Sequence, residues 1–145
     1  MKLSKRTEYG LRAVVHLAKS WPHSFVQSKD LSKQEELPNK FLESILLALR
    51  RGGFLESKVG SGGGYRLARS PRQIRIGEVV CRLEGRLSVK DAQDNEQSRP
   101  GEIAVHIVNE KLTQATDEVL EKLTLEELAE LASRAGNLQQ SMYYI

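Results

Sequence analysis

Apolar residues recur at helical spacing through the first third of the chain. Residues 3–20 place an apolar side chain every three or four positions, which predicts a helix that a following proline ends. A second helix is expected over 28–36 with Ser28 as N-cap, and a third over 39–51 with Asn39 as N-cap. Two helices separated by a tight break, after a packing helix, are typical of a helix-turn-helix.

A glycine-rich segment follows the third helix. Two short runs of strand character, 54–59 and 65–68, flank the glycines of 60–64, which predicts a β-hairpin with a flexible tip. The glycine spacing lacks the Lys-Ser/Thr of a phosphate-binding P-loop, and a strand rather than a helix comes next. A helix-turn-helix followed at once by a hairpin predicts a winged helix, with the hairpin as the wing.

The second half alternates helical and polar segments. A fourth helix is expected over 76–83, and a long one over 102–123 that begins near a proline. The fold class is therefore mainly α with a small β-hairpin wing. We divide the chain into a winged helix-turn-helix at 1–83, a flexible loop at 84–99, a long helix with a short capping helix at 100–132, and a tail at 133–145.

Charge changes this picture because it is unevenly distributed. Residues 1–75 hold fifteen Lys and Arg against six Asp and Glu, a net +9, whereas residues 76–145 hold seven against thirteen, a net −6. A basic first half indicates a polyanionic partner such as nucleic acid, although two solvated faces without a partner would also fit.

Candidate chemistry is sparse. The single cysteine, Cys81, falls in a helical pattern that predicts a buried small apolar residue, and one cysteine cannot form an internal disulfide. The histidines His16, His23 and His106 lack metal-site spacing, and His16 is expected to be a hydrogen-bonded core residue. No nucleophile motif is present, so we predict no active site, no metal and no enzyme. Without an apolar leader or membrane-length segment, a cytoplasmic location is expected.

Three segments together resemble the Rrf2 family of bacterial transcription regulators. They are KLSKRTEYGLRA at 2–13, LPNKFLESILLALRRGGFL at 37–55 and VGSGGGYRLAR at 59–69, with a weaker likeness at TLEELA, 124–129. The resemblance implies a winged-helix DNA-binding domain, a long dimerisation helix and a homodimer that binds a palindromic operator. Many members hold an iron–sulfur cluster on three cysteines between the fourth helix and the dimerisation helix. This chain has none there, so the resemblance is to a branch without the cluster.

The resemblance also implies the DNA-contacting residues. Asn39, Lys40 and Glu43 would face bases, with N-capping and helix support as the structural alternatives for Asn39 and Glu43. The family often places an arginine where Val59 stands, which makes Lys58 the substitute in the wing. Phosphate and wing contacts complete the expected set: Ser28, Arg50, Arg51, Lys58, Val59, Gly60 and Arg66.

The function expected from these features is a homodimeric, sequence-specific DNA-binding regulator, most simply a repressor of transcription. The alternative is an interaction module whose acidic C-terminal half binds a regulatory protein or a small effector. A nucleotide-dependent enzyme ranks last, because the glycine run has the wrong spacing.

Overall fold

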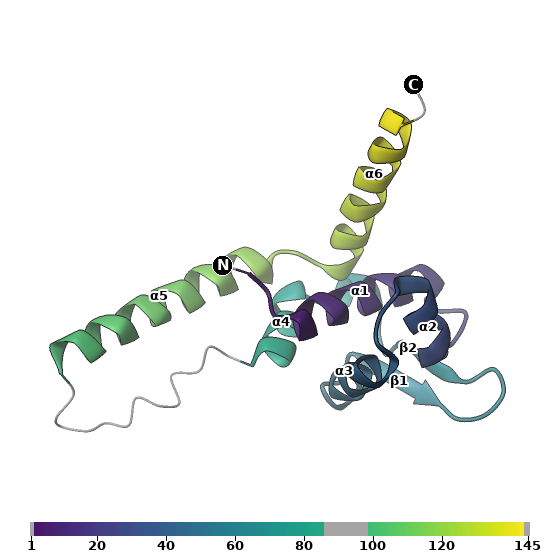
Figure 1. Ribbon diagram of the computed structural model, residues 1–145, viewed down its shortest axis with the longest axis horizontal. Helices are drawn as coiled ribbons and strands as arrows, with labels where there is room; N and C mark the ends of the chain where they lie inside the picture. The colour runs from purple at the N-terminus through teal and green to yellow at the C-terminus, as the bar shows by residue number, and fades with distance from the viewer. Residues whose placement is uncertain (1, 86–98, 144–145) are drawn as a thin grey trace.

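The computed structural model describes residues 2–85 and 99–143 as a helical body from which two long helices project (Figure 1). The expectation of a mainly α fold with one β-hairpin is confirmed. The elements are α1 (Lys5–Ser20), α2 (Ser28–Glu35), α3 (Asn39–Arg51), β1 (Leu55–Lys58), β2 (Gly64–Leu67), a 3₁₀ turn η1 (Pro71–Gln73), α4 (Ile76–Glu84), α5 (Pro100–Glu121) and α6 (Leu125–Tyr143).

The core of the body lies where α1, α3 and α4 meet. The apolar stripe of α3 is fully buried against them, because leucine and isoleucine recur there every three or four residues. Gly10 lets α1 approach α4 closely, since a Cβ at this position would lie 2.1 Å from Leu83 Cδ1. Leu125 at the start of α6 is also completely buried, so the base of α6 belongs to this core.

The start of α1 is tied to the end of α4. Ser4 is the N-cap and accepts from the backbone N–H of Thr7, while its own backbone N–H donates to Glu84 Oε1 at 2.7 Å. A hydrogen bond from the Thr7 side chain, with that from Ser4, holds the pKa of Glu84 below its usual value. These contacts fix the position of α1, the helix on which the helix-turn-helix packs.

Strand β2 of the hairpin is joined to the connection between α1 and α2. Strands β1 and β2 pair antiparallel from Leu55–Leu67 to Lys58–Gly64. Val26 adds a bridge to β2: it exchanges two backbone hydrogen bonds with Tyr65, both of 2.8 Å. Gly64 allows this approach, because its φ is +131° and a Cβ there would lie 2.3 Å from the Val26 carbonyl oxygen. The wing is thus held beside the N-terminus of α2.

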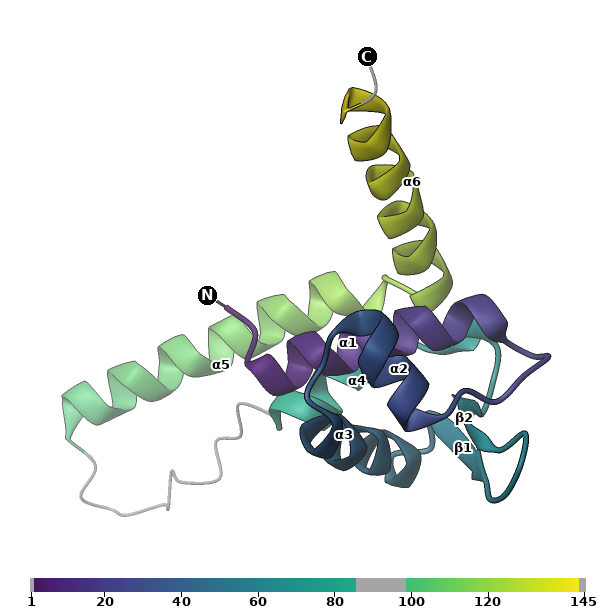
Figure 2. The ribbon, with the colours of Figure 1, turned by 45° about the vertical axis from the view of Figure 1, so that its right-hand side comes forward.

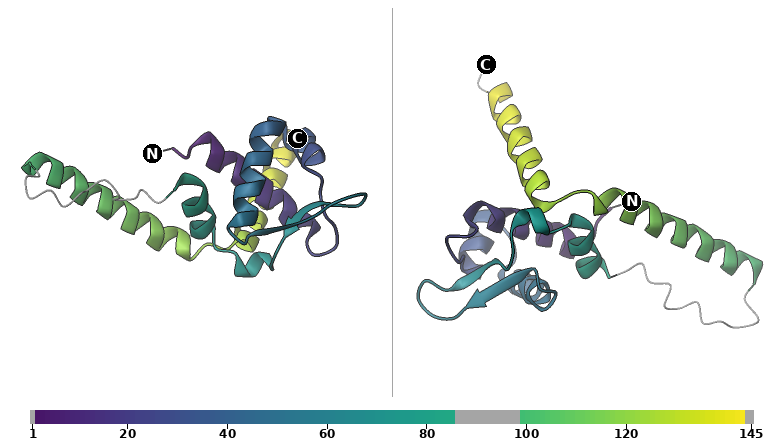
Figure 3. Two further views of the ribbon diagram at one scale, coloured as in Figure 1. Left: turned by 90° about the horizontal axis from the view of Figure 1, so that it is seen from below. Right: turned by 180° about the vertical axis from the view of Figure 1, so that it is seen from behind.

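The helices α5 and α6 leave the body in different directions (Figures 2 and 3). Backbone hydrogen bonds from Ile76 to the Leu123 carbonyl and from Leu125 to the Ile74 carbonyl, both 2.9 Å, anchor the turn between them. No residue of α5 is buried, and α6 is exposed from Glu130 to Gln140. Both helices therefore present side chains that the protomer itself does not cover.

Several sequence-based boundaries were wrong. Helix α6 continues to Tyr143 instead of ending at 132, so 133–143 is helix rather than tail. The N-cap of α2 is Gln27 rather than Ser28, and that of α3 is Pro38 rather than Asn39. Cys81 is half-buried beside Asp117, with its Sγ 3.9 Å from Oδ1, rather than fully buried. Most of the expected flexible loop, residues 86–98, lies outside the described residues.

Candidate nucleic-acid interface

One face of α3 is open to solvent along its whole length and is polar except at one leucine. The helix buries Leu42, Ile45, Leu46 and Leu49, and the residues between them point outward because a turn takes 3.6 residues. The exposed set comprises Asn39, Lys40, Glu43, Ser44, Leu47, Arg50 and Arg51. In Figure 1, α3 and the hairpin lie below α1, on the side away from α6.

The two helices of the helix-turn-helix begin without side-chain caps. The N-cap residues are Gln27 for α2 and Pro38 for α3, and the side chain of neither accepts a hydrogen bond from a backbone N–H of the first turn. By contrast, α1 is capped by Ser4, and at the start of α6 Thr124 Oγ1 accepts from the backbone N–H of Glu127 at 3.2 Å. Open first-turn N–H groups with the positive end of the helix dipole suit a phosphate oxygen.

The wing tip is an uncharged loop. Val59 is 97% exposed, and Gly60 and Gly62 take φ of +96° and +73° with open space around them. Lys58 lies at the end of β1, with Nζ 6.0 Å from the centre of the Phe25 ring. The tip therefore presents the side chains of Val59 and Ser61 together with backbone groups, and Lys58 lies behind it.

Arg66 is half-buried and contacts groups of the protein itself, away from the wing tip. Its Nε donates to Glu56 in a short ion pair, and its Nη1 donates to the Pro22 carbonyl at 3.3 Å. The guanidinium also lies 4.3 Å from the centre of the Phe25 ring. These contacts attach the wing to the loop between α1 and α2, so Arg66 positions the wing.

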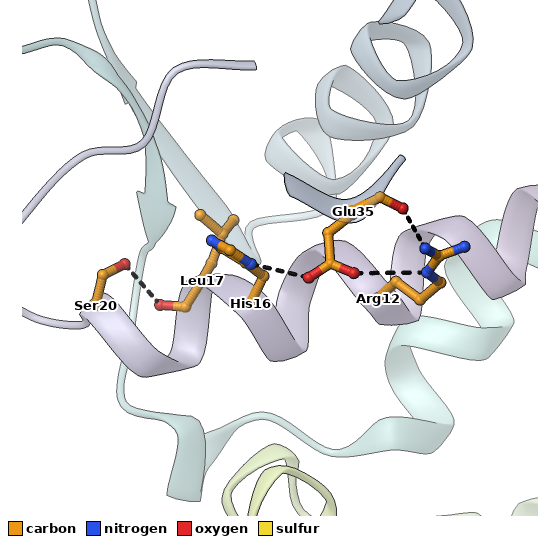
Figure 4. Close-up of polar contacts among 5 residues, drawn as sticks. All are labelled: Arg12, His16, Leu17, Ser20 and Glu35. Carbon is orange, nitrogen blue, oxygen red and sulfur yellow. Dashed lines mark hydrogen bonds and ion pairs between the residues drawn. The ribbon is translucent and has the colours of Figure 1, made fainter. Parts of the chain in front are cut away.

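A polar cluster fixes α2 on α1 (Figure 4). Glu35, the last residue of α2, accepts from His16 Nδ1 at 2.9 Å and faces Arg12 Nε at 3.6 Å. The Arg12 guanidinium also donates to the Glu35 carbonyl, and Ser20 Oγ donates to the Leu17 carbonyl at 3.3 Å on the same helix. His16 is thus a hydrogen-bonded, half-buried residue that orients the helix-turn-helix.

The structure brings most of the expected contact residues to one side of the body. The α3 residues share a single outward face, with Ser28 at the start of α2 and the wing beside it. Sequence analysis missed Ser44, whose Oγ accepts from Arg6 Nη1 at 3.3 Å, and Leu47, which is 36% exposed. The helical period that located the core of α3 would have identified both, because they fall between the core positions.

Other chemistry is not assembled in the described parts of the chain. Over 2–85 and 99–143 no group of three His, Cys, Asp or Glu side chains could hold a metal ion. Among the described helices none is both long and apolar enough to cross a lipid bilayer.

Comparison with known proteins gives a consistent result. Residues 3–132 match the Rrf2 family model, described as an iron-dependent transcriptional regulator. The HTH-type transcriptional regulator CymR of Bacillus subtilis (strain 168) is 31% identical over 145 residues, 100% of both chains. NsrR of the same organism, also an HTH-type transcriptional regulator, is 32% identical over 132 residues, 88% of this chain and 90% of that protein.

Solved structures agree with the sequence relatives. The structure of B. subtilis CymR (YrzC), described as the global cysteine regulator, superposes with a TM-score of 0.70 at 30% identity, covering 90% of this chain and 98% of that one. T. potens IscR superposes with a TM-score of 0.74 at 31% identity, covering 99% and 97%. The relatives named here are regulators, not enzymes.

Proposed function

The chain belongs to the Rrf2 family of DNA-binding transcriptional regulators, and we propose that it is a homodimeric repressor that binds a palindromic operator. The observation that carries the proposal is the outward face of α3, which is polar throughout except for one leucine and lies on the same side of the body as the wing. A single exposed helix face of this kind matches the major groove in width and chemistry.

Three elements of the protein contact DNA: α3, the start of α2 and the wing. Helix α3 enters the major groove, where Asn39, Lys40 and Glu43 face base edges. Arg50 and Arg51, at the end of α3, and the open amides at Ser28 contact phosphates. The wing, with Lys58, Val59 and Gly60 at its tip, follows the neighbouring minor groove. Phosphate contacts supply affinity, and base contacts supply sequence preference.

The homodimer is supported by an uncovered apolar stripe on α5. Its members repeat at alternating spacings of three and four residues: Val105, Val108, Leu112, Ala115 and Val119. The four larger side chains are 62%, 55%, 39% and 71% exposed in chain order, and this spacing is typical of the seam between two paired helices. To reach two successive major grooves, the dimer must hold its two α3 helices about 34 Å apart, one turn of DNA.

The proposal predicts a salt-dependent affinity that rests on Arg50 and Arg51. Changing either to alanine should weaken binding to every DNA sequence alike and lower the slope of log affinity against log salt by about 0.9 per lost phosphate contact. Fluorescence anisotropy at several salt concentrations measures both quantities. Arg134→Ala is the matched control, since Arg134 is a 77% exposed arginine on α6, away from α3. Binding by the wild type that ignores salt would contradict the proposal.

The iron named in the family description does not fit this chain. A cysteine-held cluster needs several thiolates, and Cys81 is the only cysteine of the whole sequence. Across the α4–α5 contact it faces the carboxylate of Asp117, and within residues 2–85 and 99–143 no third His, Cys, Asp or Glu completes a metal site with these two. We propose that operator binding requires no iron–sulfur cluster.

Iron independence gives a direct prediction. Protein purified without oxygen should contain no stoichiometric iron or acid-labile sulfide, and Cys81→Ala should bind the operator like the wild type. Metal analysis and anisotropy on the same sample test it. Stoichiometric iron with sulfide, lost in Cys81→Ala, would mean that two chains share a cluster through their single cysteines.

The alternative function retains support from α6. Leu131 and Leu138 are 56% and 67% exposed on a helix that leaves the body, within the acidic half of the chain. In this alternative, a regulatory protein or small effector binds the acidic half and controls DNA binding by the basic first half. The alternative therefore keeps the DNA-binding role and adds a binding partner. We propose a cytoplasmic location and no catalytic role.

A further inference from the structure

Two large hydrophobic side chains are exposed between residues 4 and 85, and both lie on the proposed DNA-binding side. They are Leu47, 36% exposed on α3, and Val59 at the wing tip. Val59 belongs to the wing contacts already proposed. Leu47 is unexplained, because it interrupts the polar face of α3 with four apolar carbon atoms.

The neighbours of Leu47 define where it would lie on DNA. Glu43 precedes it by one helical turn, about 6 Å along the axis, and Arg50 follows by three residues on the same face. Leu47 therefore lies between a residue proposed to face bases and one proposed to contact phosphate. This position places its side chain at the base edges of the major groove.

The major groove offers one apolar group that a leucine side chain can contact. Phosphates and the hydrogen-bonding edges of the bases offer no stabilising contact to a leucine, whereas the C5-methyl group of thymine is apolar and projects into the major groove. Burying the two apolar surfaces against each other removes both from water. Resting on the proposed function, we infer that Leu47 determines specificity by contacting a thymine methyl group, once in each operator half-site.

The test uses replacement of thymine by uracil, which removes the methyl group and leaves base pairing intact. The full-length protein first selects its operator from a random duplex pool. One position at a time, a thymine and its equivalent in the other half-site are then both replaced by uracil. For each such operator, affinity is measured for the wild type, Leu47→Ala and the control Ser44→Ala. Ser44 lies on the same α3 face and has no apolar side chain to lose.

The wild type and Ser44→Ala should lose about fourfold in affinity per half-site at one thymine position, the effect of one buried methyl group. Leu47→Ala should bind the thymine operator more weakly and show no further loss with uracil at that position. Because each uracil penalty is a ratio within one protein, reduced stability of Leu47→Ala cancels. Leu47→Asn, which keeps the shape of the side chain and replaces its methyl groups by a polar amide, should behave like Leu47→Ala.

Two outcomes overturn the inference while leaving the proposed function intact. In one, Leu47→Ala keeps the full uracil penalty; in the other, the wild type binds a selected operator with no penalty at any thymine. If the wild type selects no operator and shows no salt-dependent affinity, the proposed function fails together with this inference.

Discussion

Replacing Val108 and Leu112 together with glutamate is expected to make the protein monomeric and to abolish operator binding. Both side chains are exposed in the protomer, so the change leaves its core intact. In the proposed dimer they face a second copy, and burying unpaired carboxylates at such a seam costs about 3–5 kcal/mol. A monomer would contact one half-site only, although every basic residue of the DNA-binding face remains. Sedimentation velocity and a gel-shift titration of one sample measure both effects.

A control on the same helix distinguishes the seam from its opposite side. Ile107→Glu with Gln114→Glu also adds two carboxylates to α5, but these positions lie together on the other side of the helix from Val108 and Leu112. The control should stay dimeric and bind DNA. If the control became monomeric and the Val108, Leu112 variant stayed dimeric, the two copies would meet through the face that carries Ile107.

Gly64→Ala is expected to detach the wing and to destabilise the protein by about 3 kcal/mol or more. A Cβ at Gly64 would lie 2.3 Å from the carbonyl oxygen of Val26, a backbone atom that cannot rotate away, and the φ of +131° is strained for any other residue. The bridge between Val26 and Tyr65 would break, and the wing would lose its position beside α2. Urea unfolding measures the stability, and operator affinity should fall with it.

Gly62→Ala separates this effect from a general need for glycine in the hairpin. Gly62 also has a positive φ, +73°, but a Cβ there would meet no atom within 4 Å. Its replacement should cost about 1 kcal/mol and leave the wing in place. Equal effects of the two substitutions would show that backbone conformation, rather than the approach of Val26, decides the need for Gly64.

The helix-turn-helix and the hairpin were predictable because their signals are local. The apolar period of α3 named its core residues, and the glycines of 60–64 could only mark a turn between two short strands. The end of α6 was not predictable in this way. Only the base of α6 packs on the body, and from Glu130 to Gln140 every residue is exposed. This part of the helix has no buried stripe, so residues 133–143 resembled a polar tail.

The proposed contact residues also fall into those that the sequence located and those that only the tertiary structure located. The sequence determined which side of α3 faces outward, since residues between core positions must point away from the core, and this placed Lys40, Glu43 and Arg50 in solvent. Only the tertiary structure decided the role of Arg66. Glu56 lies opposite Arg66 in the hairpin, but Phe25 reaches it because the α1–α2 loop folds onto the wing. Spacing along a chain records which side chains share a face, but the partner of each face is determined by elements distant in the sequence.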